Sequence, residues 1–192
     1  MKIVIIDGHP DAAKGRLCHA LADAYQQGAE AGEHEVRRIA VADLDFPLLR
    51  SAQDFTSGMV PTVIDEAQKT IRWAEHVVVV YPLWLGTLPA VLKGFFEQVL
   101  RPGFAFHASA KGWPEPKLKG RSARIIVTMG MPAFAYRWFY GAHSLKSFER
   151  NILKFVGFGP IRETLLGNVA GATEKKREKW MREMRRLGER GR

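Results

Sequence analysis

Residues suited to chemistry gather first in a short loop near the start of the chain, "DGHPDAAKGRLCH" (7–19). The loop leads into a predicted helix, and the free N–H groups and positive dipole at a helix start bind anions. Lys14 and Arg16 add positive charge, His9 offers a further donor, and Gly15 lets the backbone approach a ligand closely. A phosphate fits this pattern, although the loop matches neither G-x-x-x-x-G-K-[ST] nor G-x-G-x-x-G. A solvated basic turn with a satisfied histidine is the alternative.

A stiff loop, "PLWLGTLP" (82–89), follows the apolar run "HVVVVY" (76–81). Its two prolines fix its ends, and Gly86 allows close backbone approach. Trp84 and Leu85 would supply an apolar wall. The loop's N–H and C=O groups could hydrogen-bond the edge of a flat heterocycle.

An aromatic-rich segment, "GMPAFAYRWFYGAH" (130–143), follows the segment 121–129, a further predicted strand. Gly130 permits close approach, and the aromatic residues are Phe134, Tyr136, Trp138, Phe139 and Tyr140. Aromatic clusters are more often core than ligand contact, so both interpretations stay open. A phosphate site beside two walls for a flat ring would suit a flavin nucleotide.

The hydrophobic pattern predicts the elements that must position these loops. Strands are expected at 2–6, 35–41, 76–81, 121–129 and 159–169, and helices at 16–32, 61–74, 89–100, 145–155 and 173–192. Segments 42–58 and 101–120 are expected to be irregular. Five alternations of strand and helix favour one α/β domain over 1–192, with a parallel sheet covered on both faces. Ligands of such sheets bind beyond the carboxyl ends of the strands, where all three loops fall.

Charge and composition narrow the class of protein. The chain has 192 residues, 46% of them hydrophobic, and a formal net charge of +9. Residues 173–192 hold nine Lys/Arg and four Glu, so they contribute +5. Trp180, Met184 and Leu187 recur there at helical spacing, which predicts an amphipathic helix with a solvated basic face. We expect no nucleic-acid partner, because no binding module is evident.

Cysteine usage and hydropathy suggest a location. The one cysteine, Cys18, excludes a disulfide framework and a cysteine-based metal site, and we expect no metal. The apolar run near the N-terminus is too short for a signal peptide, and no stretch approaches the length of a membrane span. We therefore expect a cytoplasmic protein that is not membrane-embedded.

Three motifs resemble those of the flavodoxin-like NAD(P)H:quinone oxidoreductases. They are "GHPD…LCHAL" (8–21), "YPLWLGTLPAVLKGFFEQVLRPGFAF" (81–106) and "TMGMPAFAY…GAH" (128–143). The middle motif is the most specific, because it is long and fixed in spacing. The resemblance covers nearly the whole chain and is weakest in the tail. It implies a flavodoxin-like three-layer sandwich whose five parallel strands lie in the order 2-1-3-4-5.

The resemblance also implies cofactor-binding residues. His9 corresponds to a histidine beside the flavin phosphate. Arg16, Leu17 and Cys18 stand where the family usually has Ser-Phe-Asn, so Arg16 would hold the phosphate here. The residues expected along the flavin ring are Pro82, Leu83, Trp84, Leu85 and Gly86, with Thr128, Met129, Gly130 and Met131 on its other edge.

Tyr136 and His143 correspond to a tyrosine and a histidine that line the family's nicotinamide and quinone pocket, with His143 offset by one residue. As catalytic residues they would stabilise charge near the flavin or donate a proton to the quinone. Tyr136 could equally be a pocket wall. The implied reaction is ping-pong: NAD(P)H reduces the flavin, and a quinone then takes two electrons from it.

The resemblance also bears on the identity of the flavin, on the assembly and on the alternative functions. We expect FMN slightly over FAD, because the long C-terminal extension of the mammalian enzymes is missing. A homodimer is expected, in which segments 42–58 and 101–120 reach the site of the opposite subunit. The alternatives are a regulatory flavoprotein subunit of a potassium-efflux type transporter and an azo or nitro reductase. A one-electron flavodoxin is disfavoured by the pI of about 9.9, since flavodoxins are usually acidic.

Overall fold

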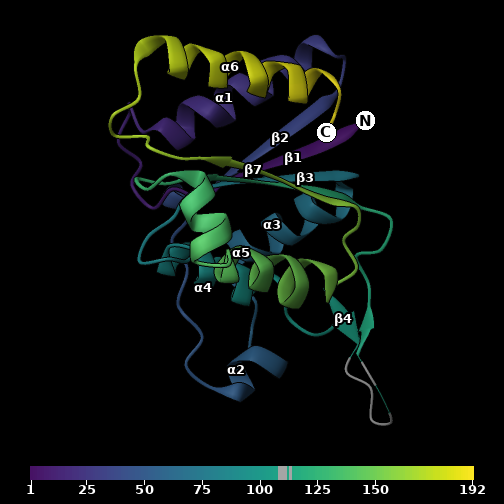
Figure 1. The fold of residues 1–192 in the computed structure, drawn as a ribbon. Helices are drawn as coiled ribbons and strands as arrows, with labels where there is room; N and C mark the ends of the chain where they lie inside the picture. Colours follow the sequence, from purple (N-terminus) through teal and green to yellow (C-terminus); the bar gives the residue numbers. More distant parts are fainter. Residues whose placement is uncertain (108–111, 113) are drawn as a thin grey trace.

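A computed structural model shows a central sheet between two layers of helices (Figure 1). The structure describes residues 1–107, 112 and 114–192. The five strands are β1 (Lys2–Asp7), β2 (Glu35–Ala40), β3 (His76–Pro82), β6 (Ser122–Thr128) and β7 (Ile161–Leu166). They are all parallel and lie in the order β2-β1-β3-β6-β7. The predicted five-stranded order is therefore confirmed.

The sheet is covered on both faces, as predicted. Helices α1 (Leu17–Ala31) and α6 (Glu174–Glu189) lie above it in Figure 1, and α3 (Thr62–Trp73), α4 (Ala90–Val99) and α5 (His143–Ser147) lie below. The helix expected at 145–155 is α5 followed by a π-helical segment, η3 (Phe148–Lys154). Within the described residues, no helix is both long and apolar enough to cross a membrane.

The segments expected to be irregular contain short elements. The first holds a 3₁₀ turn, η1 (Val41–Asp43), and a helix, α2 (Ala52–Ser57). The Ser51 side chain starts α2 by accepting the N–H of Asp54 at 3.0 Å, a cap that the sequence analysis overlooked. The second holds two antiparallel strands, β4 (Phe106–His107) and β5 (Glu115–Pro116). Residues 108–111 and 113 of that excursion lie outside the described residues.

The aromatic-rich segment was also expected to be a loop, and here the expectation was partly wrong. Residues Ala135–Phe139 form a π-helical turn, η2. Its bulky residues and the flanking proline and glycine obscure the helical pattern in the sequence. Tyr136 is buried, whereas Trp138 and Phe139 are 81% and 85% exposed. Of the two interpretations left open for these aromatic residues, the core applies to Tyr136 and not to Trp138 or Phe139.

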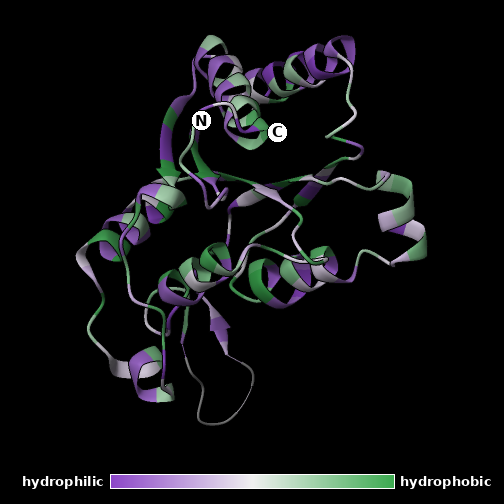
Figure 2. Cartoon of the chain, turned by 90° about the vertical axis from the view of Figure 1, so that its left-hand side faces the viewer, coloured by the Kyte–Doolittle hydropathy of each residue, from purple (hydrophilic) through white to green (hydrophobic). Residues whose placement is uncertain are grey.

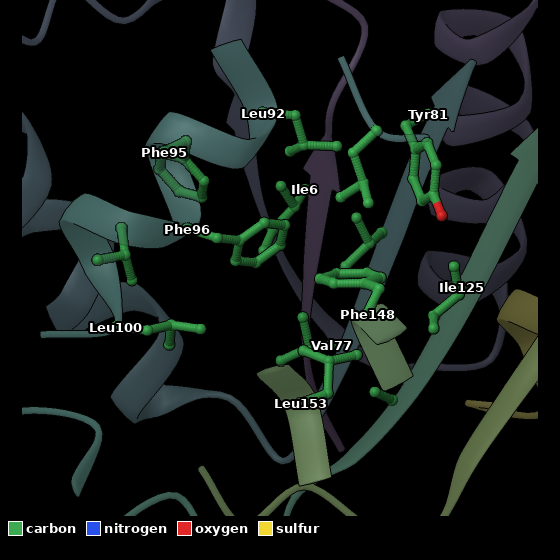
Figure 3. Close-up of a cluster of buried hydrophobic side chains, with 14 of the residues drawn as sticks. Ile6, Val77, Tyr81, Leu92, Phe95, Phe96, Leu100, Ile125, Phe148 and Leu153 are labelled. Atoms are coloured by element: carbon green, nitrogen blue, oxygen red, sulfur yellow. The ribbon is translucent and has the colours of Figure 1, made fainter. Parts of the chain in front are cut away.

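The core lies on both sides of the sheet because the central strands are apolar on both faces. β3 is buried along its whole length, as expected for the middle strand of a parallel sheet. Below the sheet, Phe96 of α4 points toward Phe148, which also contacts Tyr81 (Figure 3), and the Phe96 and Phe148 ring centroids are 4.9 Å apart. In Figure 2, hydrophobic colouring concentrates toward the sheet and hydrophilic colouring on the outer helices.

Above the sheet, α1 and α6 approach closely because glycines face the partner backbone. A Cβ on Gly28 would overlap the main-chain carbonyl of Arg185, and one on Gly188 would overlap that of Tyr25. Trp180 and Met184 are buried against α1, as the helical spacing predicted.

Candidate functional site

The first loop ends at a helix start that no side chain caps among the residues that the structure describes. Arg16 is the N-cap residue of α1 and makes no capping hydrogen bond with its side chain, and the first turn holds no acidic residue. Gly15 has φ +95°, and a Cβ there would meet no atom within 4 Å. The free N–H groups and the helix dipole therefore face open space, which is an anion site suited to a phosphate.

His9 stands beside this helix start with one ring nitrogen engaged. Its Nδ1 lies 3.1 Å from the N–H nitrogen of Asp11 and 3.2 Å from the carbonyl oxygen of the same residue. Because the Asp11 N–H can only donate, Nδ1 accepts it and the ring proton sits on Nε2. Burial lowers the pKa of His9, which keeps the ring neutral. The Nε2–H is then available to a phosphate oxygen.

Arg16, Leu17 and Cys18, which were also expected around the phosphate, differ in exposure and in their partners. The Arg16 guanidinium is half-exposed and pairs with the Asp11 carboxylate, with Nε at 2.8 Å, so holding a phosphate would require it to leave that partner. Leu17 and Cys18 form the first turn of α1. The Cys18 Sγ lies 3.4 Å from Thr128 Oγ1, and burial raises the pKa of this thiol to about 12, so it stays protonated. Only the backbone of Cys18 can serve an anion.

The second loop is a tight turn. The N–H of Trp84 donates to the carbonyl of Thr87 at 3.0 Å, and the reverse bond is 2.9 Å. Leu85 and Gly86 have φ values of +47° and +79°, so both occupy the left-handed region. A leucine in that region costs about 1–2 kcal/mol, which indicates that its surroundings fix the turn.

This turn narrows the set of backbone groups open to a ligand. Trp84 and Thr87 satisfy each other, and the N–H of Leu83 donates to the Thr128 carbonyl at 2.8 Å. Across the part of the chain that the structure describes, the N–H groups of Leu85 and Gly86 have no protein acceptor. Gly86 lies in open space, so these two amides remain for the edge of a ring.

The third loop is held by the segment after β7. The N–H of Met129 donates to Leu166 at 2.9 Å, and the N–H of Asn168 donates to the Met131 carbonyl at 3.0 Å. Gly130 is exposed, and a Cβ there would meet nothing within 4 Å. The chain thus presents Gly130 as an open backbone position on a fixed support.

The three loops meet at the carboxyl edge of the sheet. The ring centroids of His9 and Trp84 are 6.0 Å apart, edge to face, which joins the first and second loops. A cavity of about 340 Å³ opens between the second and third loops. It continues into a cavity of about 680 Å³ through shared lining residues, Leu85, His143 and Ser144. Cavities of this size suit a ring-shaped ligand with a second molecule beside it.

The two expected catalytic residues, Tyr136 and His143, differ in exposure and in hydrogen bonding. Tyr136 lines the smaller cavity but is 2% exposed, and its hydroxyl oxygen lies 2.7 Å from Ser144 Oγ and accepts the N–H of Leu145 at 3.2 Å. His143 is exposed and lines both cavities. The structure brings both to the same pocket as Gly86 and Met131, and of the two only His143 has an unburied polar group.

A family model described as a flavodoxin-like fold matches residues 1–188. The chain belongs to this flavodoxin-like family. An uncharacterized NAD(P)H oxidoreductase from Haemophilus influenzae is 26% identical over 182 residues, covering 93% of this chain and 89% of that protein. FMN-dependent NADH:quinone oxidoreductase 3 from Bacillus cereus is 26% identical over 183 residues, covering 85% of this chain and 83% of the relative.

A solved structure agrees at the level of the fold. NAD(P)H:quinone oxidoreductase from Methanothermobacter marburgensis superposes on this flavodoxin-like chain with a TM-score of 0.81, at 20% identity over 98% of each chain. The relatives named above are NAD(P)H-dependent oxidoreductases by name, which is consistent with a redox site at the sheet edge.

The sequence analysis missed a charged cluster behind the first loop of this flavodoxin-like fold. Asp7, at the end of β1, is 1% exposed and contacts His19 at 2.6 Å and Arg38 at 2.6 Å. Arg38 also pairs with Asp23. These residues come from β1, α1 and β2, so no local pattern links them. The only hint in the sequence is an aspartate directly after an apolar strand.

Proposed function

We propose that this protein is a flavin-dependent NAD(P)H oxidoreductase that reduces a quinone or a similar acceptor by two electrons. The observation that carries the proposal is one sheet edge with an uncapped helix start at one end and open backbone at Gly86 and Gly130 at the other. A flavin, when bound, would accept a hydride from NAD(P)H and pass it to the acceptor. The names of the relatives support the same chemistry.

The residues would divide the work as follows. The first-turn N–H groups of α1 and the His9 Nε2–H would hold the phosphate. The amides of Leu85 and Gly86 would meet one edge of the ring system, and Gly130 would allow close approach at another. Tyr136 would serve as a wall that holds the start of α5, while His143 would donate a proton to the reduced acceptor.

We propose FMN as the flavin, with FAD as the alternative. The support is the FMN dependence in the name of the Bacillus cereus relative. The adjoining cavity of about 680 Å³ would admit NAD(P)H and the acceptor in turn, which a ping-pong cycle requires. Extraction of the bound flavin followed by chromatography tests the assignment directly.

We also propose a cytoplasmic homodimer. The rim of the pocket exposes apolar side chains to an unusual degree: Leu85 is fully exposed, Trp84 is 49% exposed, and Tyr140 is 56% exposed. Such patches mark interaction surfaces. Helix α2 and strand β4 project below the body in Figure 1, where they would be accessible to the pocket of a second copy. Sedimentation velocity with and without flavin tests the assembly.

Initial rates test the reaction. NADH or NADPH oxidation is followed at several fixed quinone concentrations, with an azo dye as a second acceptor. Parallel double-reciprocal lines with the quinone are expected, because one site serves both substrates in turn. Faster turnover of the azo dye would identify the azo reductase alternative. No oxidation of either nucleotide by the flavin-loaded protein would contradict the proposal.

A further inference from the structure

His19 lies between two hydrogen-bond acceptors. Its Nδ1 is 2.6 Å from a carboxylate oxygen of Asp7, and its Nε2 is 2.9 Å from the main-chain carbonyl oxygen of Asp11. Neither acceptor carries a hydrogen when Asp7 is ionised. A neutral imidazole has one N–H, so it can satisfy only one of them. The geometry therefore calls for the doubly protonated imidazolium.

The charges around His19 support that state. Asp7 is almost fully buried and also contacts Arg38, while Arg38 pairs with Asp23. From the loop, His9 packs edge to face on His19 at 5.3 Å, and Arg16 is held by the Asp11 carboxylate. Burial, and to a smaller extent the charge of Arg38, lower the pKa of His19, but the hydrogen bonds to Asp7 and Asp11 and the charge of Asp7 outweigh them, and the net shift is upward.

Asp11 connects His19 to the phosphate site. Its N–H donates to Nδ1 of His9, its carbonyl accepts from His19, and its carboxylate accepts the N–H of Ala13 at 2.8 Å. Because Nδ1 of His9 accepts the Asp11 N–H, the His9 proton stays on Nε2 for as long as His19 holds Asp11 in this position. That is the tautomer that can donate to a phosphate.

We propose that His19 is a positioning residue whose charged form holds Asp11, fixes the tautomer of His9 and so keeps the first loop ready for a phosphate monoester. This inference rests on the proposed flavin site. When His19 loses a proton, it keeps Nδ1–H for Asp7, and its Nε2 lone pair faces the Asp11 carbonyl. The Asp11 carbonyl then has no donor from His19, so Asp11 is released and its N–H no longer fixes the His9 proton on Nε2.

The sign of the pH dependence follows. Affinity for a phosphate-bearing flavin is full while His19 is charged and falls as the pH rises through the raised pKa of His19. His9 does not produce this fall, because its lowered pKa leaves it neutral throughout that range. The second ionisation of a phosphate monoester, near pH 6, acts in the opposite direction and is complete below the range of interest.

Flavin binding by the apoprotein tests the inference. The dissociation constants of FMN and of riboflavin, which lacks the phosphate, are measured by fluorescence quenching from pH 6.5 to 9. FMN affinity is expected to fall about tenfold over this range, the size expected for losing one hydrogen bond to a charged partner. Riboflavin affinity is expected to change less than twofold, since it does not use the phosphate loop.

Two variants and one spectroscopic signature complete the test. His19→Gln is expected to bind FMN about tenfold more weakly at pH 6.5 and with a flat profile. His19→Lys stays charged at pH 9 and is expected to retain FMN affinity there. The ¹⁵N shifts of His9 in the wild type should report a change from the Nε2–H tautomer alone to a mixture of tautomers as His19 titrates.

The contradicting results can be separated. FMN bound equally at pH 6.5 and 9, or riboflavin following the same profile as FMN, would overturn the inference and leave the proposed function standing. A wild-type protein that binds no flavin at any pH would overturn both. If His19→Gln does not fold, the wild-type profile and His19→Lys still decide.

Discussion

The hydroxyl oxygen of Tyr136 lies 2.7 Å from Ser144 Oγ and also accepts the N–H of Leu145 at 3.2 Å, so the phenol fastens η2 to the start of α5. His143 directly precedes Ser144 in the chain, but its side chain is exposed instead of buried, and it lines both cavities. The two residues that the family resemblance grouped as catalytic therefore have different surroundings.

This difference predicts different kinetic effects for the two side chains. His143→Gln is expected to lower kcat for quinone reduction about 100-fold, the low end for loss of a general acid, with flavin content unchanged. Tyr136→Phe keeps the pocket wall and is expected to change kcat less than threefold. It also removes the acceptor of the Leu145 N–H, and this unpaired group should lower the free energy of unfolding by about 1–3 kcal/mol. Stopped-flow rates and urea unfolding measure the two effects. A larger kcat loss in Tyr136→Phe than in His143→Gln would contradict this division.

Gly86→Val is expected to abolish flavin retention, because a branched Cβ would stand where the ring edge approaches the turn. Strain at positive φ is a confounding effect, and Gly120→Val controls for it. Gly120 has φ +81° against +79° for Gly86, and it also lies in open space away from the pocket. Flavin absorbance per chain is the measurement. Equal flavin loss in both variants would show that backbone strain, not the site, is responsible.

The contact between α1 and α6 predicts a stability effect with an unusual sign. Alanine normally stabilises a helix relative to glycine by about 1 kcal/mol. Gly28→Ala should instead lower the free energy of unfolding by about 1–3 kcal/mol, because the added Cβ would overlap the backbone of Arg185. Gly171→Ala, in open space before α6, is the matched control and should be nearly neutral. A stabilising Gly28→Ala would mean that the helices are further apart than described.

His76 predicts an acid sensitivity of the fold. Burial, and then Arg124, lower the pKa of His76 to about 4. An unfolded chain takes up a proton below about pH 6.5 and the folded chain does not, so stability falls as the pH drops from 6.5 toward 4. Between pH 7 and 5 this amounts to about 2 kcal/mol.

Urea unfolding at pH 7 and pH 5 isolates that contribution. The loss of stability between the two pH values should be smaller in His76→Gln than in the wild type by about 2 kcal/mol. His107→Gln, which removes an exposed histidine, should behave as the wild type does. Identical losses in His76→Gln and the wild type would show that His76 titrates normally.

The sequence predicted what depends on local periodicity. β3 and the turn after it were located from the apolar run at 76–81 and from the glycine and prolines that follow. Both signals consist of consecutive residues, so they can be recognised without the fold. Spacing in the tail likewise predicted that Trp180 and Met184 face inward. The parallel order followed from the alternation of elements.

What the sequence did not predict depends on residues that meet only in the folded chain. Leu85 adopts a left-handed conformation that a leucine rarely takes, so the tight turn has no signature. His19 sits in the first turn of α1 with nothing nearby in sequence to mark it, and its partner Asp7 lies twelve residues earlier. The role suggested for Arg16 changes for the same reason, because its contact with Asp11 arises from the shape of the loop.

The central claim is that this sheet edge holds a redox-active flavin, and an absorbance spectrum of the purified protein tests it most directly. We expect flavin bands, as isolated or after adding FMN, that bleach when NAD(P)H is added without oxygen and return when a quinone follows. A protein that takes up neither FMN nor FAD, or a bound flavin that neither nucleotide reduces, would contradict it.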